Sequence, residues 1–257
     1  MLSVCVVTYN TPERIRECLA SVHGTLKTVD YELLVLDLGT DSTIPKTENT
    51  RFWRRKPSYF AKSYNFLASR ARGDSLLILN SDVILKPNCV YLMLKELDKD
   101  VGIVGCRLIY PPESPTAGLI MHAGVYLQLM PNSSEVAFVD RGMYHQDSAL
   151  FHHTQDVPVV TGACMLIRTG AFLAVGPFDE RYKNGREDIA LCLGMWEHGW
   201  RVRYCGQAAA YHLQNGTGGT NNLGKTSLEF DDYNRAVLNK HLRDKEPLIK
   251  KLSQLQP

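Results

Sequence analysis

Residues 74–82 (DSLLILNSD) constrain the fold more than any other stretch of this 257-residue chain. Their apolar run lies between Gly73 and Pro87 and contains no polar residue at alternate positions. Such a run is typical of a strand that is buried on both faces of a parallel sheet. Ligands of these sheets gather beyond the carboxyl ends of the strands. Asp82 therefore stands where a metal ion on a phosphate would be held; the alternative is a turn aspartate that caps a helix near Pro87.

The first hundred residues predict alternating strands and helices. Strands are expected at residues 2–7 and 31–36, and a helix at 60–71 precedes the buried run. Two more helices follow from apolar residues at helical spacing, namely Ile15, Cys18, Leu19 and Val22 in one and Val90, Met93, Leu94 and Leu97 in the other. This alternation indicates βαβ units and a parallel sheet. We expect a Rossmann-like half that binds a nucleotide.

After the first hundred residues the predicted elements are shorter and less regular. Strands are expected at residues 102–110, 157–168 and 201–205, with a long irregular stretch at 111–155. An apolar run at 208–212 and helix-forming sequence follow. We interpret this part as the other half of the same domain, in which loops build an acceptor pocket.

The sequence thus predicts an α/β fold in a single domain, with a mostly parallel central sheet flanked by helices. We expect this domain to span residues 1–225, with the nucleotide-binding half at about 1–100 and the acceptor half at about 101–225. Residues 226–257 are expected to be a C-terminal helical extension of the same domain. The length of the chain and its hydrophobic content of 44% suffice for one substantial core.

Composition argues against several classes of protein. A net charge of +2 gives no surface that seeks polyanions, so no nucleic-acid partner is expected, and the basic segment 51–56 (RFWRRK) is interpreted as a solvated loop. The seven cysteines lack a CxxC pair and mostly lie in apolar runs, which indicates reduced core thiols. No signal sequence and no apolar run of roughly 18 residues is present. We expect a cytoplasmic protein, with peripheral contact to the membrane left open.

Residues 219–226 (GTNNLGKT) match the phosphate-loop pattern GxxxxGK[ST]. In an ATPase or GTPase this motif needs a following helix and several more strands, one of which carries a metal-binding aspartate. Only 31 residues remain after Thr226, so we reject this interpretation. A dinucleotide oxidoreductase is also disfavoured, because no GxGxxG follows the first strand.

Residues 184–188 (NGRED) open a helix in which one carboxylate lies on the apolar face. Asp188 shares that face with Leu191, Cys192 and Met195. Such a position is unusual for a simple surface charge, and it makes Asp188 a candidate site residue. The alternative is an N-cap or a partner of the helix dipole, which contributes some tenths to about 1 kcal/mol.

Eight segments occur in a characteristic order along the chain. They are residues 4–10 (VCVVTYN), 34–41 (LVLDLGTD), 60–65 (FAKSYN), 73–82 (GDSLLILNSD), 160–168 (VTGACMLIR), 176–180 (GPFDE), 187–188 (ED) and 211–212 (YH). Together they resemble the family 2 inverting glycosyltransferases, and most of all the soluble subset that includes the rhamnosyltransferase-like enzymes of bacteria. The resemblance covers about residues 2–216. It implies the GT-A fold, in which the N-terminal half binds a nucleotide-sugar and the C-terminal half receives the acceptor.

The resemblance also implies an activity. The enzyme would move a hexosyl or deoxyhexosyl group, with inversion, from a UDP- or dTDP-linked sugar to a hydroxyl group. The acceptor would be a glycan, a lipid-linked molecule or another acceptor in surface polysaccharide or glycoconjugate synthesis. Mn²⁺ or Mg²⁺ is implied as the cofactor, because a metal ion stabilises the negative charge that builds on the leaving diphosphate.

Carried over position by position, the resemblance assigns roles to particular residues. The nucleotide would be bound by Thr8, Tyr9, Asn10, Asp37, Lys62, Asn65 and Ser81, with Asp37 on the base. The metal ion would be bound by Asp82 and His212. The donor sugar and the acceptor would be bordered by Asn80, Thr161, Gly162 and Ala163. Asp188 matches the catalytic base of the family, and the adjacent Glu187 would support it.

Three positions depart from the family pattern. Asn80 stands where the metal-binding motif commonly has its first aspartate, and Ala190 and Gly194 replace the Asp and Arg that usually follow the catalytic pair. Two alternatives therefore stay open: a sugar-1-phosphate nucleotidyltransferase, and a catalytically inactive module that binds a nucleotide-sugar or a glycan. The first needs a Gly-rich basic loop after the first strand, where this chain has Thr-Tyr-Asn-Thr-Pro. The retained Asp82, Asp188 and His212 argue against the second.

Overall fold

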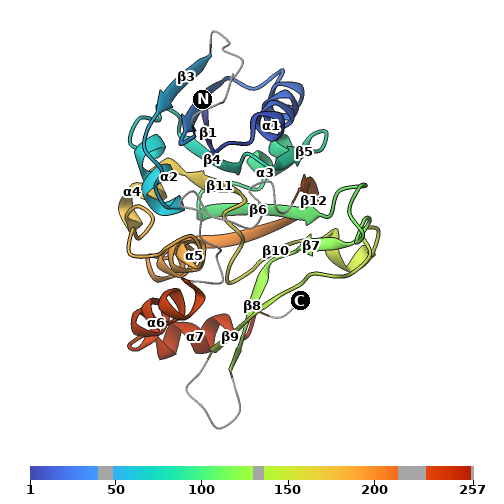
Figure 1. The fold of residues 1–257 in the computed structure, drawn as a ribbon. Coiled ribbons are helices and arrows are strands. Elements are labelled where there is room, and N and C mark those ends of the chain that lie inside the picture. Colours follow the sequence, from blue (N-terminus) through green and yellow to red (C-terminus); the bar gives the residue numbers. More distant parts are fainter. Residues whose placement is uncertain (40–48, 130–135, 214–229, 256–257) are drawn as a thin grey trace.

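The computed structural model shows one large mixed sheet with helices on both of its faces (Figure 1). It describes residues 1–39, 49–129, 136–213 and 230–255. The phosphate-loop-like segment 219–226 and the first residues of the predicted C-terminal extension lie outside these ranges.

The N-terminal half forms a parallel part of the sheet. Its strands are β1 (Leu2–Thr8), β2 (Tyr31–Asp37), β3 (Thr50–Arg54) and β4 (Ser75–Asn80). In space they follow the order β4-β1-β2-β3. The apolar run of β4 is fully buried, because strands lie on both of its edges and helices cover both faces. The predicted alternation of strands and helices is confirmed in this half.

The C-terminal half extends the same sheet with strands of both directions. β11 (Cys164–Arg168) runs antiparallel between β4 and β6 (Val101–Ile109), and β12 (Arg201–His212) runs parallel to β6. The shorter strands at this side are β5 (Val83–Leu85) and β10 (Thr154–Asp156), which pair with β12, and β7 (Ile120–His122), which pairs with β6. β8 (Val125–Leu129) and β9 (Val136–Asp140) form a separate antiparallel pair.

Helices cover the sheet on both faces. α1 (Pro12–Thr25) and α3 (Cys89–Lys95) pack on one face, and α2 (Phe60–Ala68), α4 (Thr169–Val175) and α5 (Glu187–Glu197) pack on the other. α6 (Asp231–Leu242) and α7 (Glu246–Leu252) pack against α5 and the β8–β9 pair, and a short 3-10 helix, η1 (Ala149–Phe151), precedes β10. Within the described ranges no helix is both long enough and apolar enough to cross a membrane.

Side-chain burial agrees with the apolar patterns of the sequence. The predicted inner face of α1 is buried and consists of Ile15, Cys18, Leu19 and Val22. On α5 the residues Leu191, Cys192 and Met195 are buried as expected. All seven cysteines are buried free thiols. The helical and strand periodicities therefore identified the core correctly.

The basic segment 51–56 was predicted to be a solvated loop, and for its first residues this is wrong. β3 includes them and pairs with β2 in parallel. Trp53 packs edge-on against Phe66 of α2, with ring centroids 5.8 Å apart. The guanidinium group of Arg51 lies 5.1 Å from the centre of the Trp53 ring. This segment is an edge strand, since it pairs with β2 alone, and its aromatic side chains pack against the core although its charges suit solvent.

The predictions for the second half need further corrections. The stretch 111–155 is not wholly irregular, because it contains β7, β8, β9 and η1, which have only 3 to 5 residues each. The strand expected at 157–168 begins only at Cys164. The runs 201–205 and 208–212 belong to one strand, β12, whose pairing with β6 shifts between Cys205 and Ala209. Elements this short or irregular show too little periodicity to be recognised from sequence.

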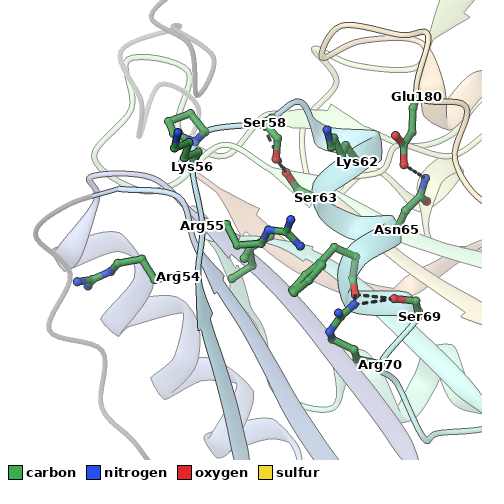
Figure 2. A pocket seen from close by; sticks show the side chains of 13 residues that line it. Arg54, Arg55, Lys56, Ser58, Lys62, Ser63, Asn65, Ser69, Arg70 and Glu180 are labelled. Carbon is green, nitrogen blue, oxygen red and sulfur yellow. Dashed lines mark hydrogen bonds between the residues drawn. The ribbon is translucent and has the colours of Figure 1, made fainter.

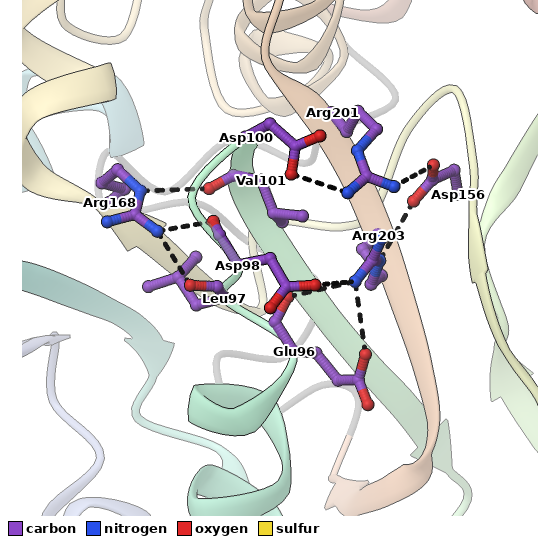
Figure 3. Close-up of polar contacts among 9 residues, drawn as sticks. All are labelled: Glu96, Leu97, Asp98, Asp100, Val101, Asp156, Arg168, Arg201 and Arg203. Carbon is purple, nitrogen blue, oxygen red and sulfur yellow. Dashed lines mark hydrogen bonds and ion pairs between the residues drawn. The ribbon is translucent and has the colours of Figure 1, made fainter.

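A network of ion pairs closes the end of the sheet that lies opposite Asn80 (Figure 3). It joins Arg168, Arg201 and Arg203 to Glu96, Asp98, Asp100 and Asp156 or to their backbone. The side chain of Arg203 is only 11% exposed, and its Nε lies 3.0 Å from an Asp156 oxygen. Because Arg168 pairs with Ser75 at the start of β4, this network is remote from the strand ends where ligands bind. Its role is structural.

Gly105 of β6 offers a test of how tightly the sheet packs under the loop that precedes β11. A Cβ atom at this position would lie 2.5 Å from the Cβ of Val160. We expect Gly105→Ala to lower the free energy of unfolding by about 1–3 kcal/mol, the usual cost of overpacking. The measurement is urea denaturation followed by circular dichroism. Gly170→Ala is the matched control, since no atom lies within 4 Å of a Cβ there, and an equal loss in both variants would contradict the packing argument.

Candidate active site

The predicted nucleotide-binding residues of the N-terminal half meet at one edge of the sheet. Thr8 at the end of β1 pairs with Asp37 at the end of β2, and Val7 pairs with Asn80 at the end of β4. Tyr9 and Asn10 follow Thr8, and Ser81 follows Asn80. The carboxyl ends of parallel strands lie side by side, so positions far apart in the sequence converge there.

Asp82 and His212 lie together although they are far apart in the sequence. β5 pairs with the end of β12, with His212 opposite Val83, and the amide of Leu213 donates to the carbonyl oxygen of Asp82 at 2.8 Å. The Nε2 atom of His212 lies 3.3 Å from an Asp82 carboxylate oxygen, and both side chains are partly exposed. Burial would raise the pKa of Asp82, but the hydrogen bond and the charge of His212 bring it below its ordinary value.

The alternative interpretation of Asp82 as a helix cap is wrong. α3 begins at Cys89, and its N-cap residue is Asn88. Asp82 lies in the turn between β4 and β5 instead, where its carboxylate faces His212. The pair offers a carboxylate oxygen and an imidazole nitrogen, both of which bind divalent metal ions.

The donor set at this edge is small. Among the described residues, no group of three or more His, Cys, Asp or Glu side chains is arranged to hold a metal ion. Asn80 brings an amide oxygen to the same strand end, where the Tyr64 hydroxyl lies 3.4 Å from it. These residues fit a divalent ion that takes most of its ligands from the oxygens of a bound diphosphate.

Asp188 lies at the start of α5 with both carboxylate oxygens held. Oδ2 accepts a hydrogen bond from the Gly162 amide at 2.9 Å, and Oδ1 accepts one from the Ile189 amide at 2.8 Å. Burial raises the pKa of Asp188 above its ordinary value, and these amides partly oppose that rise. The side chain stays partly exposed. Asp188 is therefore a fixed carboxylate with an increased affinity for a proton.

Glu187, the residue before it, is more deeply buried. It is 5% exposed, and its Oε2 atom accepts a hydrogen bond from the Gly185 amide at 2.6 Å. Burial, and then the charge of Asp188, raise the pKa of Glu187 to about 8. At neutral pH Glu187 is mostly protonated, so the negative charge of the pair lies on Asp188.

The turn before α5 is held by asparagine side chains that the sequence interpretation did not single out. Asn184 and Arg186 have positive φ angles of 50° and 71°. The Asn184 side chain accepts a hydrogen bond from the Phe60 amide at the start of α2, at 2.6 Å. The buried Asn234 of α6 binds both the amide and the carbonyl group of Lys183, at 2.9 and 3.1 Å. Only the Asn-Gly pair at 184–185, a turn signal, could have indicated this arrangement.

Residues 161–163 connect Asp188 to the strand end of β4. The Asn80 amide donates to the carbonyl oxygen of Ala163 at 2.9 Å, while Gly162 binds Asp188. A Cβ atom on Gly162 would lie 3.0 Å from the ring of Phe60 and 3.4 Å from the Cβ of Asp188, so the absence of a side chain permits this contact. The amide of Thr161 donates to Nε2 of His122 at 3.2 Å. His122 was not predicted, because a single histidine in a short strand gives no signal.

Asp37 is fully buried at the end of β2. Its carboxylate accepts hydrogen bonds from the Gly39 amide at 2.9 Å and from Arg54 Nε at 3.0 Å. Half of the Arg54 side chain is exposed, at 51%. The contact of Asp37 with a nucleobase stays a prediction, and Arg54 is the part of this ion pair that reaches solvent.

Lys62 and Asn65 line a pocket of about 750 Å³ between α2 and the end of β3 (Figure 2). Its other charged residues are Arg54, Arg55, Lys56, Arg70 and Glu180, so the lining is mainly basic. The Asn65 side chain binds the amide and the carbonyl group of Phe178, at 3.0 and 2.8 Å. Asn65 therefore joins α2 to the segment before α5, and its predicted contact with a nucleotide remains a prediction, as does that of Lys62.

The fold and this edge define a GT-A type of α/β domain, and the comparisons with known proteins identify its family. Residues 3–176 match the family model described as glycosyl transferase family 2. The chain belongs to this family. It is 24% identical over 227 residues to the O-antigen biosynthesis protein RfbC of Myxococcus xanthus, with 83% of this chain and 17% of that protein aligned.

A second curated relative is the uncharacterized protein y4gI of Sinorhizobium fredii. It is 25% identical over 237 residues, which cover 85% of this chain and 25% of that protein. The chain thus spans a quarter or less of the length of these relatives.

Solved structures share the fold at low sequence identity. Residues 1–349 of S. aureus TarS, in complex with UDP-GlcNAc, align with a TM-score of 0.66 and 16% identity over 98% of this chain and 70% of that chain. The mannosyltransferase PcManGT from Pyrobaculum calidifontis, in complex with GDP-Man and Mn²⁺, aligns with a TM-score of 0.58 and 14% identity over 98% and 72%. The predicted GT-A fold and family are confirmed.

The raised pKa of Glu187 predicts how stability depends on pH. The folded state holds a proton that the unfolded state releases, so the free energy of unfolding falls as pH rises from about 4.5 to about 8. Glu187→Gln removes this titration and keeps an acceptor for the Gly185 amide. We expect the variant to gain stability relative to the unmodified chain across this range, by at most about 1.4 kcal/mol for each pH unit. Urea denaturation at pH 5, 7 and 9 measures the difference, and a difference that is constant with pH would contradict the prediction.

Proposed function

We propose that this glycosyltransferase moves a sugar from a nucleoside-diphosphate sugar to a hydroxyl group in a single inverting displacement. The observation that carries this proposal is the Asp188 carboxylate, which two amides hold at the turn that connects to the end of β4. The Asp82 and His212 pair lies at the same edge of the sheet, beyond the same strand. One group can therefore take a proton while the other holds the leaving diphosphate.

The base acts on the acceptor. Asp188 takes the proton of the attacking hydroxyl group. At the same time the hydroxyl oxygen forms a bond to the anomeric carbon, and the bond between that carbon and the diphosphate breaks. The raised pKa makes Asp188 a better proton acceptor than an ordinary aspartate, and the hydrogen bonds from Gly162 and Ile189 keep its orientation. One displacement by a group aligned with the leaving diphosphate inverts the anomeric configuration.

The leaving group of the reaction is the nucleoside diphosphate. Asp82 and His212 would hold a divalent ion, Mn²⁺ or Mg²⁺, which when bound stabilises the charge of the leaving diphosphate. The Mn²⁺ in the complex of the structurally similar PcManGT supports this choice. Thr8, Tyr9, Asn10 and Ser81 would line the nucleoside, with Lys62 and Asn65 near the nucleotide or its phosphates.

We also infer the chemical class of the donor and of the acceptor. We infer a UDP- or dTDP-linked hexose or deoxyhexose, because the family resemblance places Asp37 on a pyrimidine base and TarS was solved with UDP-GlcNAc. The similarity to an O-antigen biosynthesis protein supports an acceptor in surface polysaccharide synthesis, either a glycan or a lipid-linked molecule. We place the enzyme in the cytoplasm, with peripheral contact to the membrane where a lipid-linked acceptor is used.

We also propose that residues 226–257 belong to the domain of residues 1–225. α6 packs through Leu238 against Tyr182 and Ala190, and α7 packs through Ile249 and Leu252 against Leu127 and Leu193. These contacts reach the strand pair and the helix on the base side, so the extension supports the half that would receive the acceptor.

Binding of the diphosphate is expected to depend on metal through Asp82 and His212. With UDP as the probe, calorimetry should show tighter binding in Mn²⁺ than in chelator, and Asp82→Ala should remove most of the difference because the carboxylate is lost. His212→Ala should weaken the same step. Asp100→Asn in the remote ion-pair network is the control and should bind like the unmodified chain. Equal affinity in Mn²⁺ and in chelator would exclude the metal role of this pair.

Replacement of Asp188 tests the mechanism. Asp188→Asn keeps the shape of the side chain but cannot accept the proton, so we expect turnover to fall on the order of 10²-fold while donor affinity stays close to normal. Donor consumption is measured with the best substrate from a panel of nucleotide-sugars, and Glu187→Gln, which should lose less, is the control.

The anomeric configuration of the product tests whether the displacement inverts the sugar. Nuclear magnetic resonance of the transferred sugar should show the anomeric configuration opposite to that of the donor. Undiminished turnover of Asp188→Asn, or a product that retains the donor configuration, would show that the single-displacement mechanism is wrong.

A further inference from the structure

His122 is a buried histidine that the proposed chemistry does not use. It ends β7, is 2% exposed, and both of its ring nitrogens have polar partners. Nδ1 lies 2.8 Å from a carboxylate oxygen of Asp140, at the end of β9. Nε2 lies 3.3 Å from the amide nitrogen of Gly124 and 3.2 Å from that of Thr161. Three segments of the chain therefore meet at one imidazole ring: the end of β7 with the following turn, the end of β9, and the residues before β11.

These partners determine which ring nitrogen carries the proton. A backbone N–H can only donate, so Nε2 must present its lone pair to Gly124 and Thr161. The ring proton is then on Nδ1 and is donated to Asp140. The carboxylate of Asp140 selects this tautomer and fixes the plane of the ring, in the way that a carboxylate orients a histidine in metal sites and catalytic triads.

The ring in turn fixes the segment that holds the base. Thr161 donates to His122, and the next amide, that of Gly162, donates to Oδ2 of Asp188 at 2.9 Å. The following residue, Ala163, accepts from the Asn80 amide at the end of β4. The other amides that contribute to this carboxylate, those of Asp188 itself and Ile189, belong to α5, whereas Gly162 belongs to the separate segment before β11. The place of the Gly162 amide thus sets the direction of the Asp188 carboxylate.

We propose that His122, backed by Asp140, is a positioning residue for the base. It holds the 161–163 segment so that Gly162 keeps the Asp188 carboxylate directed at the acceptor hydroxyl. The proposal rests on the proposed function of Asp188. Because His122 acts through a backbone amide and touches no substrate, its loss should reduce the rate of the chemical step and leave donor binding almost unchanged.

Two replacements of His122 separate its hydrogen bonding from its bulk. His122→Leu removes the acceptor of the hydrogen bond from the Thr161 amide. We expect kcat for the best donor to fall between about tenfold and a hundredfold, the scale of a misplaced catalytic group. The affinity for UDP in Mn²⁺ should stay within about twofold of normal, because only the base side is disturbed. His122→Gln can place a side-chain oxygen near the position of Nε2 and should recover most of the rate. His145→Leu, at a histidine that is 65% exposed beside Asp147, is the matched control and should not change kcat.

A double-mutant cycle with Asp188→Asn decides whether His122 acts through the base. If it does, His122→Leu adds no further loss of turnover to Asp188→Asn. The same fold loss in both backgrounds, or a normal kcat for His122→Leu alone, would overturn the positioning role. Failure of the proposed function is distinguishable, because Asp188→Asn would then itself consume donor at the normal rate.

A second variant, Asp140→Ala, tests the proposal if His122→Leu does not fold. If thermal melting shows that His122→Leu is unfolded, the cycle is repeated with Asp140→Ala, which removes the partner of Nδ1 from a side chain that is 46% exposed. We expect a smaller fall in kcat that again disappears in the Asp188→Asn background. Additive losses, or no loss at all, would overturn the proposal in this arm as well.

Discussion

The pairing of β4 with two neighbours of opposite direction is the constraint on which the rest of the structure depends. β4 pairs in parallel with β1 and antiparallel with β11, so it joins the nucleotide-binding half to the other half. At its end the Asn80 amide binds the carbonyl oxygen of Ala163, which brings the turn whose Gly162 amide binds Asp188 to the tip of the strand. A slip of one residue in either pairing would turn every side chain of β4 to the other face. The burial of Leu76 to Leu79 on both faces therefore fixes the relative position of both halves of the site.

Two aspartates at this edge have opposite environments. The hydrogen bond and charge of His212 bring the pKa of Asp82 below its ordinary value, whereas burial raises the pKa of Asp188 despite two amide hydrogen bonds. The first environment suits a carboxylate that must stay charged to bind a cation, and the second suits one that must receive a proton. Protonated Glu187 separates these roles further, because it leaves one negative charge at the start of α5. The opposite pKa shifts of the two aspartates thus follow from burial and hydrogen bonding rather than from residue type.

The sequence predicted those parts in which local pattern and burial agree. The runs of β1, β2 and β4, the apolar face of α1, and the convergence of Asp82 with His212 through the ordered motifs are confirmed. β3 was missed because Phe52 and Trp53, its packed side chains, lie among basic residues that mask the strand pattern. The strands between β6 and β10 were missed because they are too short to show a period. His122 and Asn234 could not be predicted at all, since their partners, Thr161 and Lys183, are brought to them only by tertiary structure.

Two of the three departures from the family pattern, Ala190 and Gly194, have a packing explanation, which bears on the alternative of an inactive binding module. Ala190 is 7% exposed and packs against Tyr182 and Leu238, so an aspartate there would place a charge in an apolar cluster formed by α6. A Cβ atom on Gly194 would lie 2.9 Å from the side chain of Val175 at the end of α4, which leaves no direct path for an arginine. Both substitutions therefore accompany the way α4 and α6 pack on α5. Neither disturbs the carboxylate of Asp188, which lies on the part of α5 that faces Gly162. The loss of two charged family residues is thus compatible with the catalysis proposed for Asp188, because packed helices occupy the space they would fill while the Asp188 carboxylate keeps its hydrogen bonds.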